Sequence, residues 1–202
     1  MRRILAVIVA LAACAKPPPP SAPSAIVRAE VKRAEDAELE RRHDVARAAF
    51  ESAIEKATDP PSIHFARREF AETLITWGEV ESARGQLEKA LAAVPDDPVA
   101  WQMLGLVRNG LGDVTGAFEA LERSKQLAPR AWIPRRDLAA LHFKLALGRD
   151  AAPDPAVAAR HRAAALAEYC GMLELDLPDR LREKVKWAIG ALSNAEAAPP
   201  SP

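Results

Sequence analysis

One spacing of 34 residues, which recurs along the middle of the chain, constrains the fold more than any other feature of the sequence. Three positions recur one period later: Ala83 as Ala117, Leu87 as Leu121 and Pro95 as Pro129. A fixed period of this length indicates that one structural unit is copied along the chain. Each copy has an apolar face that it cannot bury alone, so neighbouring copies must stack.

The segment 98–131 is the clearest copy of this unit. Trp101, Leu104 and Gly105 have the spacing W-x2-L-G in its first half, and Ala117 begins the pattern of its second half. These residues resemble those of the tetratricopeptide repeat (TPR), a helix–turn–helix unit of 34 residues. The resemblance implies an all-α fold in which TPR helix pairs stack into a right-handed superhelix. It also implies a function in binding proteins or peptides.

Helical patterns place the repeat domain at residues 25–194. The expected helices span residues 25–42, 44–57, 63–77, 79–94, 98–111, 114–127, 132–147, 156–175 and 178–194. They form repeats at about 27–62, 64–97, 98–131 and 132–177, followed by a capping helix at 178–194. The first repeat lacks the Trp, Leu and Gly signature, and the turn of the fourth is expanded. About three to four stacked repeats are just enough for a stable array.

Local signals define several helix ends. Asp97 before Pro98 is typical of an N-cap, and Gly78 is typical of the left-handed residue that ends a helix. The capping helix has a charged face that suits the open end of a stack, made of Asp179, Arg180, Arg182, Glu183, Lys184 and Lys186. Its apolar face consists of Leu181, Val185, Ala188, Ile189 and Leu192. Residues 195–202 are predicted to form a disordered tail.

The N-terminus has the features of an export signal. Arg2 and Arg3 precede an uninterrupted apolar run at residues 4–13. A helix of that length spans about 15 Å, half of the hydrocarbon core of a bilayer, so residues 1–13 are predicted to be a signal peptide. The run ends in Leu-Ala-Ala followed by Cys14, which resembles a bacterial lipobox. The resemblance implies cleavage before Cys14 and its acylation with diacylglyceryl and palmitate chains. The alternative is an ordinary signal peptide in which the cysteine follows the cut by chance.

Residues 14–24 contain the acylated cysteine and a linker rich in proline. Five prolines favour an extended polyproline-type spacer, which reaches about 31 Å over ten residues. We expect it to hold the domain away from a membrane, and a ligand for a proline-binding domain is the alternative. Ala15 follows Cys14, where an aspartate would suggest inner-membrane retention. The expected location is therefore the bacterial cell envelope, with an outer-membrane anchor facing the periplasm.

Composition and motifs exclude several function classes. The chain has 28 basic and 28 acidic side chains, and this balance argues against a partner made of nucleic acid. None of its four histidines lies in an H-E-x-x-H pattern, and its two cysteines, Cys14 and Cys170, have no metal spacing. P-loop, dinucleotide-binding and nucleophile-elbow motifs are also absent. We expect a protein that is not an enzyme and that needs no cofactor or metal.

The remaining conspicuous side chains are expected to have structural roles. His142 is predicted to be a packing or groove residue, and His161 is predicted to face solvent. Cys170 is expected to be a small buried apolar residue. The four tryptophans, which include Trp187 in the last helix, are expected to pack between helices.

In TPR proteins that bind peptides, certain positions of each first helix line the groove. Carried over to this chain, they are Phe65, Arg68, Glu72, Ile75 and Thr76, then Val99, Gln102, Leu106 and Asn109, then Ile133, Arg136, Ala140, Phe143 and Lys144. Arg68, Gln102 and Arg136 lie one period apart and would form a polar column across three helices. In the alternative interpretation, the two arginines only pair with Glu72 and Asp137 on their own helices. Chaperone-binding TPR domains need asparagine where this chain has Glu72, which would repel a carboxylate ligand.

The sequence thus predicts an adaptor for protein–protein interactions in the cell envelope, anchored to a membrane through Cys14 and helping to assemble an envelope complex. An accessory or scaffold subunit of a cell-wall or secretion enzyme complex is the second hypothesis. Self-association through an open end of the stack is the third. The identity of the partner and the oligomeric state stay open at this stage.

Overall fold

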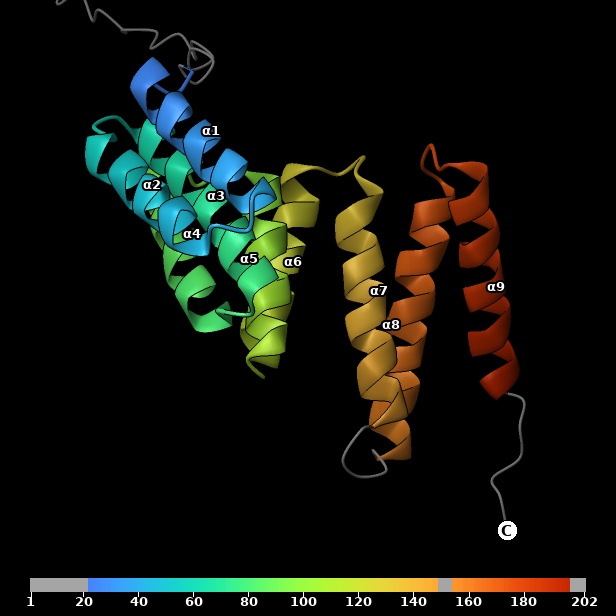
Figure 1. Cartoon of the computed structure of the whole chain (residues 1–202). Coiled ribbons are helices and arrows are strands. Elements are labelled where there is room, and N and C mark those ends of the chain that lie inside the picture. Colours follow the sequence, from blue (N-terminus) through green and yellow to red (C-terminus); the bar gives the residue numbers. More distant parts are fainter. Residues whose placement is uncertain (1–21, 149–153, 197–202) are drawn as a thin grey trace, which may run out of the picture.

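The computed structural model describes residues 22–148 and 154–196, and within these ranges it contains nine helices and no strand (Figure 1). The helices are α1 (Ala25–Leu39), α2 (His43–Lys56), α3 (Pro60–Trp77), α4 (Val80–Ala93), α5 (Pro98–Gly110), α6 (Val114–Leu127), α7 (Trp132–Leu147), α8 (Pro155–Leu173) and α9 (Asp179–Glu196). Packing is closest within the pairs α1–α2, α3–α4, α5–α6 and α7–α8. The predicted all-α stack of helix pairs with a final single helix is confirmed. The predicted signal peptide, Cys14 and most of the linker lie outside the described residues.

Aspartates and prolines set the starts of several helices. The Asp97 side chain accepts a hydrogen bond from the backbone N–H of Val99 at 2.8 Å, which confirms the predicted cap. Asp59 caps α3 in the same way, through the N–H of Ser62. The structure places the start of α3 at Pro60, three residues before the predicted start. Proline suits the first turn because its missing N–H would have no partner there.

Two helix ends show how the chain turns between partners. Gly78 has a φ of 81° and ends α3 in the left-handed conformation, as predicted. The structure ends α1 at Leu39, three residues before the predicted end. Arg41, with a φ of 58°, reverses the chain there, and the N–H of Arg42 bonds to the carbonyl of Ala37. This left-handed residue explains the earlier end, since a continuing helix needs a negative φ.

The first six helices share one continuous apolar core. It contains buried residues from every helix between α1 and α6, from Val27 to Ala120. Phe50 and Phe70 stack in this core with ring centroids 5.0 Å apart. Gly105 lets α5 approach α6 closely, because a Cβ at this position would lie 2.6 Å from the Cγ of Leu121. The Leu-Gly spacing of the sequence therefore encodes close packing within the helix pair.

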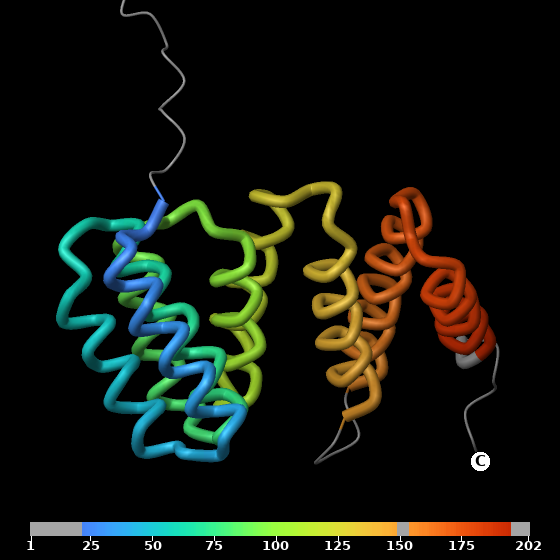
Figure 2. Tube along the Cα trace, turned by 45° about the horizontal axis from the view of Figure 1, so that its top comes forward, coloured from blue at the N-terminus to red at the C-terminus, as the bar shows by residue number. Residues whose placement is uncertain are grey.

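The last three helices take no part in the main core and have two small apolar clusters of their own. One cluster joins α6 to α7 through Ala117, Leu121, Leu138 and Leu141. A second joins α8 to α9 through Met172, Leu177 and Val185. In Figure 2 these helices extend the stack beyond the block formed by α1 to α6. The apolar face of the capping helix packs as predicted, with Val185 and Leu192 buried.

Three predictions for single side chains in this region are wrong. His161 does not face solvent freely, since its Nδ1 lies 3.0 Å from the Nδ1 of His142 and both rings pack against Phe118. Cys170 is exposed because it lies on the face of α8 that points away from its neighbours. Trp187 is 76% exposed, since α9 is the last helix and none of the other described helices covers its outer face. His142 is a packing residue, as expected.

Candidate interaction groove

The first helices of the pairs form the inner layer of the stack. Helices α1 and α3, α3 and α5, and α5 and α7 approach one another closely, whereas α2, α4, α6 and α8 make no comparable backbone approach. A stack whose two layers differ in spacing curves toward the more tightly spaced layer. The helices α1, α3, α5 and α7 therefore line the concave face, where the resemblance places the groove.

Large apolar side chains are exposed along this inner layer. Ile75 on α3 is 37% exposed, Val99 and Leu106 on α5 are 47% and 43% exposed, and Ile133 and Phe143 on α7 are both 39% exposed. All five occupy predicted groove positions, and we call them the apolar groove residues. Single exposed apolar side chains are common on folded proteins, but several gathered on one face indicate a contact surface.

The polar groove residues of α5 and α7 bind one another. Gln102 donates to Asp137 Oδ2 at 2.6 Å, and Arg136 Nε donates to Asp137 Oδ1 at 2.8 Å. Lys144 donates to Asn109 Oδ1 at 3.0 Å. Asp137 is only 7% exposed, so this network lies in the floor of the groove and ties α5 to α7. Arg136 thus pairs with Asp137 on its own helix, as expected if these arginines are only surface ion-pair partners and not ligand-binding residues.

Arg68 on α3 is also held by neighbouring carboxylates. Its guanidinium lies 2.5 Å from Glu69 Oε1 and 3.9 Å from Asp97 Oδ2, rather than against Glu72. Asp97 also lies 3.0 Å from His64 Nε2. Burial opposes ionisation of Asp97, but the adjacent His64 imidazole and the hydrogen bond from the backbone N–H of Val99 outweigh it and hold the pKa of this carboxyl below its usual value. The predicted polar column is thus paired within the protein.

Phe65 lies apart from the apolar groove residues. It packs partly against the main core and lines a pocket of about 420 Å³ with Ala22, Pro23, Pro61, His64, Val94, Asp96, Asp97 and Pro98. The chain enters the domain beside this pocket, where the N–H of Ser24 bonds to Ser62 Oγ at 2.9 Å. This predicted groove residue therefore belongs to the site where the linker meets the domain.

A second pocket, of about 340 Å³, lies between α1 and α3 at the N-terminal end of the groove. Its lining residues are Lys32, Glu35, Glu38, Leu39, Phe50, Glu69, Glu72, Thr73 and Thr76. Glu72, a predicted groove residue, lies here with an exposed side chain. Burial raises the pKa of Glu69, and the nearby carboxylates of Glu72 and Glu35 add to this effect against the opposing charge of Arg68. We call this site the acidic pocket.

Sequence reasoning missed the contribution of α1 to this pocket. Glu35 and Glu38 were not among the predicted groove residues, because the first repeat lacks the signature that aligns the others. Their spacing of three residues on one helix places both side chains on one face, which is the signal that was available.

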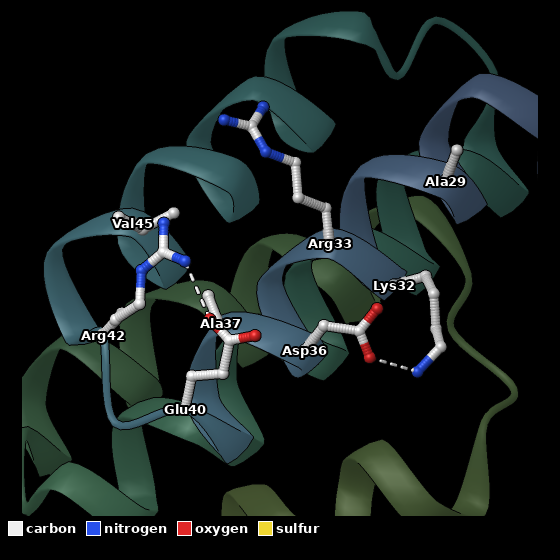
Figure 3. A pocket seen from close by; sticks show the side chains of 8 residues that line it. All are labelled: Ala29, Lys32, Arg33, Asp36, Ala37, Glu40, Arg42 and Val45. Atoms are coloured by element: carbon white, nitrogen blue, oxygen red, sulfur yellow. Dashed lines mark hydrogen bonds and ion pairs between the residues drawn. The ribbon is translucent and has the colours of Figure 1, made fainter.

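A third pocket, of about 370 Å³, lies between α1 and α2, and its charges compensate one another (Figure 3). Lys32 pairs with Asp36 at 2.6 Å, and Arg42 pairs with Glu40 at 2.7 Å. Such exposed ion pairs are common on helix surfaces, and those on α1 and α2 contribute little to the stability of the fold.

The described part of the chain carries no constellation for metal binding or membrane insertion. No three His, Cys, Asp or Glu side chains among residues 22–148 and 154–196 are placed to hold a metal ion together. None of the helices in these ranges combines the length and the hydrophobicity needed to cross a bilayer.

Comparison with solved structures establishes the fold class. The crystal structure of MamA, whose fold is TPR-like, superposes with a TM-score of 0.67 over 85% of this chain and 83% of that chain, at 13% sequence identity. A protein from Bacteroides ovatus, provisionally described as a protein-binding protein, superposes with a TM-score of 0.53 over 85% of this chain and 98% of its own, at 12% identity. No protein-family model matches the sequence, and no curated protein matches it. The chain thus has a TPR-like helical repeat fold.

Proposed function

We propose that this protein is a non-enzymatic adaptor that binds a segment of another protein in its concave groove. The observation that carries the proposal is the row of apolar groove residues on α3, α5 and α7, all between 37% and 47% exposed. Burying them against a partner would be favourable, at about 25 cal/mol for each Å² of apolar surface removed from water. The B. ovatus neighbour, provisionally described as a protein-binding protein, supports the same class of function.

We further propose that the adaptor acts in the bacterial cell envelope, attached to a membrane by lipid on Cys14. The lipobox-like sequence and the proline-rich spacer support this location. Two or more acyl chains would anchor the protein stably, because each buried methylene contributes about 0.8 kcal/mol. The spacer would let the groove reach partners some distance from the membrane surface.

The groove is tested by replacing two exposed apolar side chains in the full-length protein, Leu106→Ser with Phe143→Ser. Both lie on the surface, so the fold should persist while partner contact is lost. Leu111→Ser with Val157→Ser is the matched control, since these side chains are 40% and 36% exposed outside the groove. Crosslinking in envelope extracts should recover a partner with the control and with the wild type only. Equal recovery by all three proteins would refute the groove.

The anchor is tested by mass spectrometry of the mature N-terminus from bacterial membranes. An N-terminal Cys14 carrying acyl chains is expected, and Cys14→Ser should release the protein from the membrane fraction. A mature protein with an unmodified Cys14 would refute the anchor and leave the proposed groove unaffected.

A further inference from the structure

The two ends of the groove differ in charge. The part formed by α5 and α7 is apolar, and its polar side chains are paired with one another. The acidic pocket between α1 and α3 instead has four carboxylates in its lining, from Glu35, Glu38, Glu69 and Glu72, and one ammonium, from Lys32. The groove therefore changes from apolar to anionic toward its N-terminal end.

Two of the charges in the acidic pocket have fixed partners. Glu38 accepts a hydrogen bond from the indole N–H of Trp77 at 3.0 Å and lies 3.2 Å from His43 Nδ1. Lys32 donates to Asp36 at 2.6 Å, on the side of α1 shown in Figure 3, and is 3.9 Å from Glu35. The lysine charge is thus shared with a carboxylate outside the acidic pocket.

The other three carboxylates lack sufficient positive charge. Arg68 is the only cation at hydrogen-bond distance from Glu69 among the described residues, and no ion pair involves Glu72 there. The raised pKa of Glu69 has burial as its main cause and the repulsion from Glu72 and Glu35 as further causes. Carboxylates held close together without counter-charge destabilise the empty pocket, and a cation would relieve that repulsion.

The acidic pocket also offers apolar contact. Phe50 lines the pocket but is only 1% exposed, so the accessible apolar contact comes from Leu39. Leu39 lies in the lining and is 83% exposed. Outside the lining, Ile75 is exposed on α3, one of the two helices that form the pocket. A ligand with only charge, such as a free metal ion or a polyamine, would leave these surfaces uncovered.

From this combination we propose that the acidic pocket binds a cationic amphipathic segment of the partner protein. Lysine or arginine side chains would meet Glu35, Glu69 and Glu72, and an apolar side chain between them would cover Leu39. The rest of the segment would be apolar and would follow α5 and α7. This inference rests on the proposed function and adds the chemistry of the partner.

The test uses three fluorescent helix-forming peptides that share length and leucine positions and carry lysine, glutamine or glutamate at the polar positions. Fluorescence anisotropy with the full-length protein should show binding of the lysine peptide, with at least about tenfold weaker binding of the glutamine peptide. The affinity for the lysine peptide should fall as salt concentration rises. Equal binding of the lysine and glutamine peptides would overturn the proposal.

A charge-matched pair of variants separates the acidic pocket from the general charge of the protein. Glu35→Gln with Glu69→Gln and Glu72→Gln should weaken binding of the lysine peptide at least about tenfold. Glu51→Gln with Glu55→Gln and Glu119→Gln removes the same charge from exposed positions on the second helices and should leave the affinity nearly unchanged. Equal weakening by both variants would also overturn the proposal, and circular dichroism would show that both are folded.

Two further measurements separate this inference from its premise. If the lysine peptide does not bind but capture of the envelope partner still depends on Leu106 and Phe143, the cationic chemistry is wrong and the adaptor function stands. If neither holds, the proposed function itself fails. Sedimentation of the protein alone completes the test. If the wild type self-associates and the variant with Glu35, Glu69 and Glu72 replaced does not, the pocket binds a second copy of this chain. That result would overturn the choice of partner.

Discussion

The first six helices and the last three are held together by different kinds of contact. Between α1 and α6, one apolar cluster of buried residues runs through all six helices. Between α6 and α9, the apolar contacts include two small clusters, and polar side chains add further links. In these links Glu168 on α8 accepts from Lys125 on α6 at 2.7 Å and from Arg135 on α7 at 3.0 Å.

This difference indicates that the helices at one end of a repeat stack can unfold cooperatively while those at the other end are attached to them more weakly. Apolar burial is non-directional and couples every helix that contributes to it, whereas hydrogen bonds and ion pairs join particular atoms. Stability in stacked repeats is a sum of local and nearest-neighbour contributions. We therefore expect α1–α6 to unfold as one unit and α7–α9 to open at a lower free energy.

The largest expected effect comes from removing a central ring of the shared core. Phe50 is 1% exposed and stacks on Phe70, so Phe50→Ala should lower the free energy of unfolding by about 3–5 kcal/mol. Denaturant unfolding followed by hydrogen exchange should show faster exchange in all six helices, from α1 to α6. A loss confined to α1 and α2 would contradict the single cooperative unit.

The second prediction tests the tight approach of α5 to α6. Gly105→Ala would place a methyl group 2.6 Å from the Cγ of Leu121, so we expect a loss of about 1–3 kcal/mol in thermal or denaturant unfolding. Gly85→Ala is the matched control, because a Cβ there meets nothing within 4 Å. The control should be stabilised by up to about 1 kcal/mol, since alanine favours the helix. Similar effects of both substitutions would contradict the packing role of Gly105.

The same two regions show what the sequence could predict. In α3–α6 the period is regular, so the helix pairs, the cap at Asp97 and the turn at Gly78 all followed from local pattern, and the contact of Gly105 with Leu121 explains the glycine of that pattern. Beyond α7 the turn is expanded, and the register of α8 against α7 depends on a loop whose path no local rule defines. The contact between His142 and His161 and the exposure of Cys170 and Trp187 were therefore missed.

The candidate groove was predicted in part for the same reason. Repeat spacing assigned Leu106 and Phe143 to the groove, and in the structure both are exposed on helices of the inner layer. Spacing says nothing about pairing across repeats, such as that of Gln102 with Asp137, because this contact depends on the separation of α5 and α7. The contribution of Glu35 to the acidic pocket was missed since the degenerate first repeat gives no alignment for α1.

The third prediction concerns the ion pairs that join α8 to α6 and α7. Glu168 is 13% exposed in its side chain and pairs with both Lys125 and Arg135. Glu168→Gln keeps the shape but removes the charge, so we expect a loss of about 1–2 kcal/mol, less than that of an isolated buried pair because solvent reaches these side chains. Hydrogen exchange should rise in α7, α8 and α9 and stay unchanged in α1–α4. A uniform rise along the chain would contradict the division into two regions.

The smallest expected effect is a pH dependence of the last helices. His142 lies against His161, and the charged groups facing the pair are Glu122 and Lys125 on α6 and Glu168 on α8. Burial and the neighbouring imidazole lower the pKa of His142 below its ordinary value of 6.5, although Glu168 and Glu122 oppose the shift.

Because the folded state therefore binds a proton less readily than the unfolded state, stability should fall as pH drops through the ordinary histidine range and level off below the folded pKa of His142. Exchange rates corrected for intrinsic pH effects should rise between pH 7.5 and 5.5 in α7 and α8 more than in α3 and α4. His161→Gln removes the neighbouring imidazole that helps to lower the pKa of His142, so the pH dependence should shrink in this variant, while the packing of His142 against Phe118 is retained. If the variant and the wild type respond equally to pH, carboxylates elsewhere in the last three helices carry the effect, and the histidine contact contributes only packing to the weaker end of the stack.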